Sequence, residues 1–331
     1  MKKFAIILAV FLLAVLGYEI YLLIFPRTIN EVIVEIKIGE PAAVIADKLV
    51  QHGVIRSKWL FMALVRIQGV DKELSYGNYL FSGRLSTASV ARQLIDGKIM
   101  LERVTIPEGL TIRGTARRLE ASGFGNFDNY VNLAYDPVFA EQITGFQVQS
   151  LEGFLYPETY HFAEGVSEEF VLRTLVNEFF KKTATLHLPQ EFAYSFYDLI
   201  IIASIVEREA TYHDEKPLIA SVFLNRLNIG KRLQADPTVA YALSKQGIHR
   251  TTIYYNDLNI DSPYNTYRRI GLPPTPICNP SVISMQAVLE PADSEFLYFF
   301  ADRRGRHIFS KTYTEHLNKQ RALRNRTRED S

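Results

Sequence analysis

The chain opens with an uninterrupted run of apolar residues. Residues 4–25 read FAIILAVFLLAVLGYEIYLLIF, in which Glu19 is the one charged side chain. At about 1.5 Å per residue, a helix of this length crosses a hydrocarbon core of roughly 30 Å. Lys2 and Lys3 lie in the short tip 1–3 and predict a cytoplasmic N-terminus. We therefore expect a single-pass transmembrane helix over 4–25 in the inner or plasma membrane, with the rest of the chain periplasmic or otherwise extracytoplasmic.

Two other interpretations of this segment stay open. The stretch 4–16 also has nearly the length of the apolar region of a cleaved signal peptide, although no clear A-x-A cleavage signal follows and apolar residues resume at Ile20. A buried helix of a soluble protein is the second alternative. The length of the run favours the membrane anchor, in which Glu19 lies near the outer interface and reaches toward water.

Beyond Pro26 the pattern changes to short units of strand, turn and helix. Alternating apolar residues predict a strand over 31–40, after which Pro41 suits the first position of a helix over 42–51. A second helix over 58–68 is expected to begin after Ser57, whose hydroxyl suits an N-cap.

The same unit recurs further along the chain. Six positions of the first copy match the second: Val34, Ile36, Gly39, Ala46, Leu49 and Gly53 correspond to Val104, Ile106, Gly109, Ala116, Leu119 and Gly123. A partial copy at 90–94 echoes 45–49. Chance similarity between strand–turn–helix units is the alternative, since two or three copies are few for a repeat.

These patterns predict an α+β protein with several parts. The region 30–100 is similar to the small LysM-type modules that bind peptidoglycan glycan. A second strand–helix unit and a connection follow over 101–150. From Leu151 onward, prolines and aromatic residues become frequent. We expect a larger α+β domain over 151–331.

Composition narrows the classes of function. The chain has 37 Lys and Arg against 36 Asp and Glu, which argues against nucleic acid as a partner. Cys278 is the only cysteine, so an intrachain disulfide and a cysteine-based metal cluster are excluded. The 18 Tyr and 21 Phe supply rings that suit the apolar faces of sugars as well as a core.

Two candidate catalytic glutamates follow a very apolar segment. Residues 199–211 read LIIIASIVEREAT and predict a buried helix that ends near Glu207 and Glu209. Two helical positions lie about 200° apart, so the two carboxyl groups face opposite sides. A carboxyl group in apolar surroundings has a raised pKa and suits a general acid, which favours Glu207 because it is nearer the apolar run. A pair of solvated glutamates, ion-paired with Arg208 or Lys216, is the alternative.

Three further segments combine turn formers with aromatic, amide and carboxylate side chains. They are EGFLYPETY at 152–160, QADPT at 234–238 and DSPYNTYRRIGLPP at 261–274. Such loops can present rings and hydrogen-bonding groups to a polar ligand, although plain turn chemistry is the alternative. The candidate binding residues are Glu158, Tyr160, Gln234, Asp236, Thr238, Tyr264, Asn265 and Tyr267. Glu158 is either a helper carboxylate or a structural cap, with the structural role slightly favoured.

Four segments in order carry a family resemblance. EGFLYPETY, ASIVEREA, VFLNRLNIGKRLQADPTVAYAL and SPYNTYRRIGLPPTPICNP closely resemble the endolytic murein transglycosylase family, which is also called MltG or YceG-like. In that family the glutamate that opens the E-x-E pair is catalytic, and it corresponds to Glu207. The one departure is Thr275, where glycine usually follows the two prolines; it affects the local shape of a loop.

The resemblance implies a membrane-anchored lytic transglycosylase whose catalytic domain spans 151–331. Such an enzyme cuts the bond between N-acetylmuramic acid and N-acetylglucosamine within nascent glycan strands, leaves 1,6-anhydro ends without consuming water, and terminates elongation. One glutamate can protonate the leaving oxygen and then accept the proton of the C6 hydroxyl, while Asn265, Gln234 or Tyr264 orients the sugar. No metal or other cofactor is expected. The implied partners are peptidoglycan glycan strands, the lipid bilayer, and wall-synthesis machinery such as penicillin-binding proteins.

Three other functions remain as alternatives. A metal hydrolase would use Glu207, Glu209 and His213, but the chain lacks H-E-x-x-H and positions 207 and 213 lie on different helix faces. A non-catalytic scaffold would bind glycan without cutting it. A hydrolytic muramidase is chemically closest, because water and the C6 hydroxyl compete for the same cation.

Overall fold

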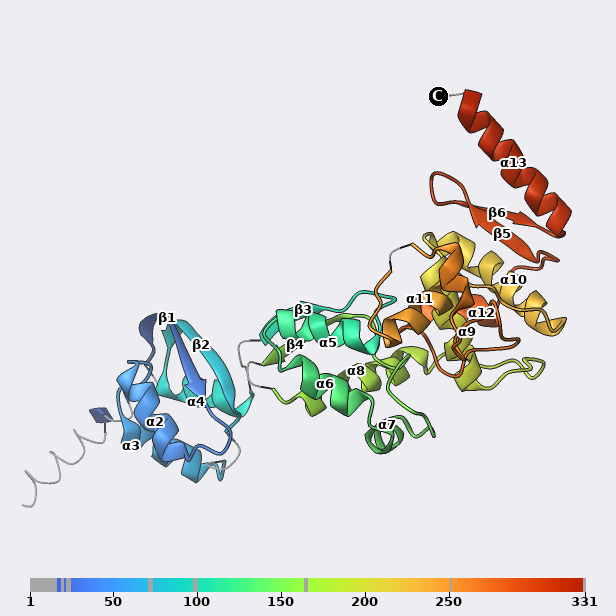
Figure 1. The fold of residues 1–331 in the computed structure, drawn as a ribbon. Coiled ribbons are helices and arrows are strands. Elements are labelled where there is room, and N and C mark those ends of the chain that lie inside the picture. Colours follow the sequence, from blue (N-terminus) through green and yellow to red (C-terminus); the bar gives the residue numbers. More distant parts are fainter. Residues whose placement is uncertain are drawn as a thin grey trace, which may run out of the picture. The chain divides into compact units, whose positions relative to one another are not determined.

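The structure is a computed structural model of a mixed α+β chain (Figure 1). It describes residues 17–18, 21, 25–70, 74–97, 101–163, 166–250 and 252–329. The described part has twelve α-helices and three two-stranded sheets. Most of the segment 4–25 lies outside the described residues, so the transmembrane helix stays a prediction. None of the helices within the described ranges has the length and apolar character needed to cross a membrane.

The chain forms two compact units. The first contains Met1–Arg103 and His161–Val166, and the second contains Val104–Tyr160 and Ser167–Ser331. The boundary falls within strands β3 (Leu101–Thr105) and β4 (Thr159–Ala163), which pair with each other. The functional domains assigned over 30–100, 101–150 and 151–331 stay predictions.

Besides parts of β3 and β4, the described residues of the first unit form two antiparallel strands and three helices (Figure 1). Its elements are β1 (Arg27–Ile36), α2 (Ala42–Gln51), α3 (Lys58–Ile67), β2 (Gly77–Leu85) and α4 (Thr87–Ile95). Val34 lies opposite Tyr79 in the register, and both side chains are buried in the core. The prediction of the first helix is confirmed at both ends, and the N-cap prediction is confirmed because Ser57 accepts a hydrogen bond from the Leu60 amide. The strand predicted over 31–40 begins earlier and ends at Ile36.

The two full copies of the repeat have the same local form. Gly39 and Gly109 both occupy the left-handed region, with φ of 78° and 74°, at the turn that follows the strand. The next helix buries the small residue and the leucine of the pattern, which are Ala46 and Leu49 in α2, and Ala116 and Leu119 in α5 (Ile112–Ala121). The strands differ in partner, since β1 pairs with β2 and β3 pairs with β4.

The second unit is mainly helical. Its helices after α5 are α6 (Phe127–Ala134), α7 (Pro137–Thr144), α8 (Glu168–Thr183), α9 (Phe196–Glu209), α10 (Lys216–Asn228), α11 (Asp236–Lys245) and α12 (Val282–Leu289). They are followed by the hairpin of β5 (Tyr298–Ala301) and β6 (His307–Ser310), and by α13 (Tyr313–Glu329). Short 3₁₀ helices cover His213–Glu215 and Tyr255–Asn259.

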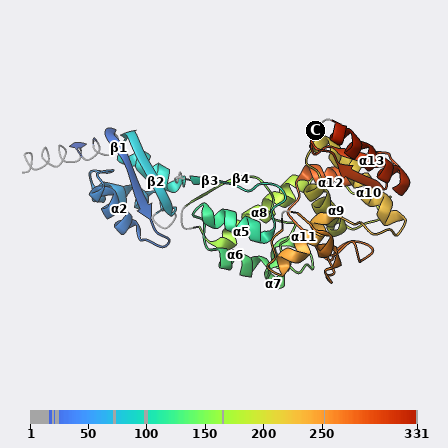
Figure 2. The same ribbon diagram turned by 45° about the horizontal axis from the view of Figure 1, so that its top comes forward.

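Helix α9 is the central element of this unit. Every residue from Leu199 to Val206 is buried, as the apolar segment predicts. The helix contacts α10, α11 and α12, which surround it in both views (Figures 1 and 2). Its N-terminus carries a capping box, in which Ser195 and Asp198 satisfy each other's backbone amides. The packing of α10, α11 and α12 around α9 places the C-terminal end of α9 among these helices.

Asn279 joins three segments that are distant in the sequence. Its side-chain Oδ1 accepts hydrogen bonds from the amides of Gly153 (2.9 Å) and Leu155 (3.0 Å). Its Nδ2 donates to the Leu110 carbonyl (2.8 Å), and its own carbonyl accepts from the Gly109 amide (3.1 Å). The side chain is buried, so it fixes the turn after β3 and the loop before β4 against the segment that leads into α12.

We expect Asn279→Ala to destabilise the second unit. The substitution leaves the amides of Gly153 and Leu155 without their partner and removes one of the two hydrogen bonds that the Leu110 carbonyl accepts from residue 279. Each unsatisfied buried group costs about 1–3 kcal/mol. Allowing for partial access of water, the free energy of unfolding should fall by about 2–4 kcal/mol. Denaturant unfolding of both proteins measures this loss, with the exposed Asn228→Ala as a control. An unchanged unfolding midpoint in Asn279→Ala would contradict the role assigned to this side chain.

Candidate active site

The last turn of α9 brings the Glu207 carboxylate to the N-terminus of α12. Glu207 Oε2 accepts hydrogen bonds from the Ser281 amide (2.9 Å), the Ser281 hydroxyl (2.6 Å) and the Ser284 hydroxyl (2.7 Å). Ser281 is the N-cap of α12. The free amides and the dipole at a helix N-terminus favour a negative charge. This arrangement therefore stabilises the ionised form of Glu207.

Lys216 holds the other carboxylate oxygen. Its Nζ lies 2.9 Å from Glu207 Oε1 and 3.3 Å from the Ser281 hydroxyl. The side chains of Lys216 and Glu207 are only 2% and 5% exposed, so the pair is almost completely removed from water. Lys216 is the first residue of α10, which places its ammonium group beside the end of α9.

Polar contacts, not apolar surroundings, set the pKa of Glu207. Burial raises this pKa, but the hydrogen bonds from Ser281 and the attraction and hydrogen bond of Lys216 outweigh it and hold it below its ordinary value. The expectation of a raised pKa for Glu207 is therefore wrong. The apolar residues of α9 precede this position, whereas the carboxylate itself lies among donors.

A second carboxyl group lies beside this pair. Glu108, in the turn after β3, places its Oε2 3.9 Å from the Lys216 Nζ. Burial and the negative charge of Glu207 raise the pKa of Glu108, although Lys216 and His213 lower it in part. The site therefore contains two carboxyl groups with opposite pKa shifts.

Glu209 faces the other side of α9, as the helical spacing predicts. It lines a cavity of about 430 Å³ with Gln234, Asp236 and Tyr267 among the other lining residues. Burial and the charge of Asp236 raise the pKa of Glu209 to about 8, against the opposing effect of Arg208 and Arg226. This shift favours the protonated form of Glu209 at neutral pH.

Three of the predicted binding residues line this Glu209 cavity. The Tyr267 hydroxyl donates to Asp236 Oδ1 (2.6 Å), and Arg226 donates to Gln234 Oε1 (3.2 Å). Gln234 has a positive φ of 52° and donates its amide to the Thr266 carbonyl (3.1 Å). The structure thus brings Gln234, Asp236 and Tyr267 together, on the side of α9 that Glu209 faces.

Three other predicted binding residues are buried inside the loops. The Thr238 hydroxyl hydrogen-bonds with the Thr266 hydroxyl (2.8 Å), and Asn265 Nδ2 donates to two carbonyls of its own loop. The Tyr264 hydroxyl pairs with the hydroxyl of Thr275 (2.9 Å). Thr275, the residue that departs from the family pattern, therefore gives Tyr264 a partner that glycine lacks. These contacts hold the loops in shape.

The remaining two predicted residues lie near β4. Glu158 forms an ion pair with Lys182 (2.9 Å) and accepts a hydrogen bond from the Thr159 amide (3.0 Å). These contacts, with the Lys182 hydrogen bond as the main cause, lower the pKa of Glu158. Tyr160 is buried and donates its hydroxyl to the Tyr156 carbonyl (2.7 Å). The geometry of Glu158 is that of a cap and surface ion pair.

Comparison with known proteins decides the family. The model of the YceG-like family matches residues 34–322. This chain belongs to the YceG-like family. An endolytic murein transglycosylase of Bacillus subtilis (strain 168) is 30% identical over 299 residues, which cover 86% of this chain and 82% of that protein.

Two further relatives agree with this assignment. An endolytic murein transglycosylase of Streptococcus pneumoniae serotype 2 is 27% identical over 308 residues, covering 84% of this chain but 56% of that protein. This chain thus spans little more than half of the pneumococcal relative. A crystal structure of a putative yceG-like protein from Listeria monocytogenes is 34% identical, with a TM-score of 0.60, and covers 87% of this chain and 98% of that one. The family resemblance of the sequence motifs is confirmed.

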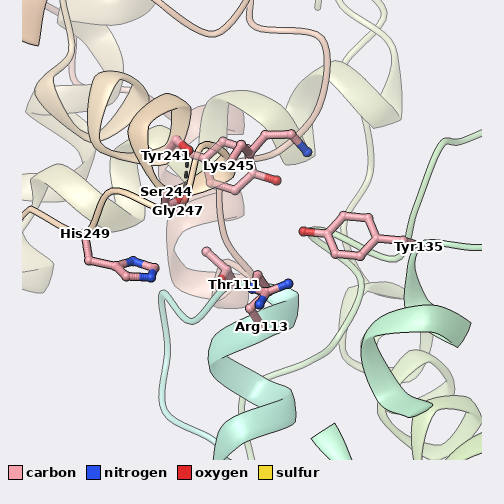
Figure 3. Close-up of a pocket in the computed structure, with 8 residues that line it drawn as sticks. All are labelled: Thr111, Arg113, Tyr135, Tyr241, Ser244, Lys245, Gly247 and His249. Carbon is pink, nitrogen blue, oxygen red and sulfur yellow. Dashed lines mark hydrogen bonds between the residues drawn. The ribbon is translucent and has the colours of Figure 1, made fainter. Parts of the chain in front are cut away.

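Another cavity of this YceG-like chain opens at the start of α5. It has a volume of about 430 Å³, and Figure 3 shows Tyr135 pointing its hydroxyl into it opposite Arg113. Lys245 Nζ lies over the ring of Tyr135 at 5.3 Å from the centroid. The buried carboxyl of Glu152 lies next to the lining and accepts hydrogen bonds from the Tyr241 hydroxyl (3.0 Å) and from the amide of Ile112. Burial raises the pKa of Glu152 to about 7, although those hydrogen bonds lower it in part.

Sequence patterns alone do not single out Glu108, Ser281 or Ser284 in this YceG-like chain. Two weak signals point to them. Glu108 lies next to the left-handed Gly109 of the repeat, where a turn presents its side chains. Ser281 and Ser284 have the spacing of an N-cap and its third helical residue. No three His, Cys, Asp or Glu side chains in the described part of the chain are grouped as metal ligands.

We expect Lys216→Met to raise the pKa of Glu207. The change removes an opposite charge and a hydrogen bond while burial persists. A carbon-13 NMR titration of the glutamate carboxyl groups measures the shift from the wild-type midpoint, which should lie below 4.5. Lys311→Met, which removes only the exposed ion pair with Glu295, is the control. Equal midpoints in wild type and Lys216→Met would contradict the electrostatic account.

The ion pair of Glu207 and Lys216 also predicts how the stability of the fold depends on pH. The pKa of Glu207 is lower in the folded chain than in the unfolded chain, so its ionised form stabilises the fold above the unfolded pKa. This contribution is lost as the pH falls through the folded pKa. Removing one partner of a buried pair costs about 3–5 kcal/mol, so Lys216→Met should be much less stable than wild type at neutral pH. The difference in the free energy of unfolding between wild type and Lys216→Met should shrink as the pH falls. Denaturant unfolding measures it, and a difference that is the same at all pH values would contradict this prediction.

Proposed function

We propose that this YceG-like chain is an endolytic murein transglycosylase with Glu207 as a catalytic residue. It cuts the bond between N-acetylmuramic acid and N-acetylglucosamine within glycan strands and leaves 1,6-anhydro ends. The observation that carries this proposal is the carboxylate of Glu207, held between a helix N-terminus and Lys216 in a chain related over most of its length to proteins of that name.

Glu207 has the properties that the charged stage of this reaction requires. Cleavage of the glycosidic bond develops positive charge at the anomeric carbon, and a fixed carboxylate in a dry site stabilises that charge. The C6 hydroxyl of the muramic acid residue then attacks this carbon and loses its proton to a carboxylate. Because the attacking group belongs to the substrate, no water is consumed. The first stage also requires a proton from a neutral acid beside Glu207.

The first unit fits a role in holding glycan near the membrane. Its strand–turn–helix elements support the LysM-like interpretation, and Trp59 on α3 is 83% exposed, which gives a sugar face a ring to lie against. A transmembrane helix over 4–25 would keep the enzyme where new strands emerge, so that cleavage terminates their elongation. Contact with penicillin-binding proteins or other wall-synthesis machinery belongs to the same proposal and is supported by the family resemblance.

We expect Glu207→Gln to reduce the release of anhydro-ended fragments from peptidoglycan by about 100-fold or more, because an amide neither carries the charge nor exchanges a proton. Glu141→Gln, which changes an exposed glutamate of α7 outside both cavities described above, is the control and should leave the activity in place. Mass spectrometry of the fragments measures both.

The alternatives give different fragments. Full activity in Glu207→Gln would show that the site assignment is wrong. Fragments that are one water molecule heavier would indicate a hydrolytic muramidase. Intact glycan after incubation with the wild-type chain would indicate a scaffold that binds without cutting.

A further inference from the structure

Two carboxyl groups meet at one ammonium group. Lys216 Nζ lies 2.9 Å from Glu207 Oε1 and 3.9 Å from Glu108 Oε2. Both carboxyl groups therefore lie within 4 Å of one cation. A negative charge on Glu207 disfavours a second negative charge on Glu108 beside it.

The chain builds this pair from two separate segments. Gly109, with its left-handed φ of 74°, turns the backbone directly after Glu108. Its carbonyl accepts a hydrogen bond from Arg208 (3.4 Å), and its amide donates to the Asn279 carbonyl (3.1 Å). The Glu108 turn is therefore tied both to the residue after Glu207 and to the segment that leads into α12.

The two carboxyl groups differ in access. Glu207 is 5% exposed and both of its oxygens are engaged, whereas Glu108 is 41% exposed. The charged or titratable groups that face Glu108 are Glu207, Lys216, His213 and Tyr156. Burial and the charge of Glu207 raise the pKa of Glu108, which favours the protonated form of the carboxyl group that a glycan can reach.

We propose that Glu108 is the general acid of this site and that Glu207 acts as its ionised partner. The inference rests on the proposed transglycosylase function. The Glu108 carboxyl gives its proton to the oxygen of the leaving N-acetylglucosamine residue as the bond from that oxygen to the anomeric carbon breaks. The C6 oxygen forms the new bond to the anomeric carbon, and its proton passes to the Glu108 carboxylate, which restores the starting state without water or a cofactor. Glu207 stays ionised throughout and stabilises the positive charge that develops at the anomeric carbon.

The test compares Glu108→Gln, Glu108→Asp and the surface control Glu141→Gln in the full chain, with anhydro ends counted by mass spectrometry. Glu108→Gln should lose about 100-fold or more of the rate, which is the usual contribution of a general acid. Glu108→Asp should recover part of that loss, because it keeps an ionisable proton, and Glu141→Gln should match wild type. Equal thermal unfolding midpoints show that the variants are folded.

The pH profile separates an acid from a structural side chain. In wild type the rate should fall at high pH as Glu108 loses its proton, and at low pH as Glu207 gains one. The residual rate of Glu108→Gln should lack the fall at high pH. A variant that keeps this fall, or an aspartate that recovers nothing, would overturn the proposal.

The two proposals fail in different ways. A wild-type rate in Glu108→Gln beside an inactive Glu207→Gln would refute only the role of Glu108. Wild-type rates in both variants would refute the proposed catalytic site as a whole, and with it the role of Glu108.

Discussion

The contact between the Glu207 carboxylate and the N-terminus of α12 is the constraint on which the site depends. A buried carboxylate is stable only when donors and an opposite charge replace its lost water. Ser281, Ser284 and Lys216 supply these, and they come from two other helices. The ends of α9, α10 and α12 must therefore meet at one point, and the three helices do contact one another.

The same contact gives the carboxyl groups of Glu207 and Glu108 different roles. The donors that keep Glu207 ionised place a negative charge next to Glu108, and this charge favours the protonated form of Glu108. Two carboxyl groups whose surroundings push their pKa values apart are suited to different roles in one reaction, here a proton donor and a fixed negative charge. Asn279 and Arg208 hold the turn that carries Glu108, so the division depends on the fold of the second unit as well as on Lys216.

Local patterns predicted local structure well. The bounds of α2, the N-cap at Ser57, the burial of α9 and the opposite faces of Glu207 and Glu209 all follow from periodicity within one segment. The surroundings of Glu207 did not follow, because Ser281 is 74 residues away along the chain. Periodicity identifies which side chains share a face, but not what that face meets. The buried Asn265 shows the same limit, since its amide holds loop carbonyls that sequence alone does not place.

We expect the substrate's own C6 hydroxyl, and not water, to complete the cleavage. Digestion of peptidoglycan in water labelled with heavy oxygen tests this directly, because a hydrolytic cut transfers one oxygen atom from solvent to the anomeric carbon of each new muramic acid end. We predict anhydro-muramic ends that carry no label. New ends that contain the heavy oxygen would contradict it.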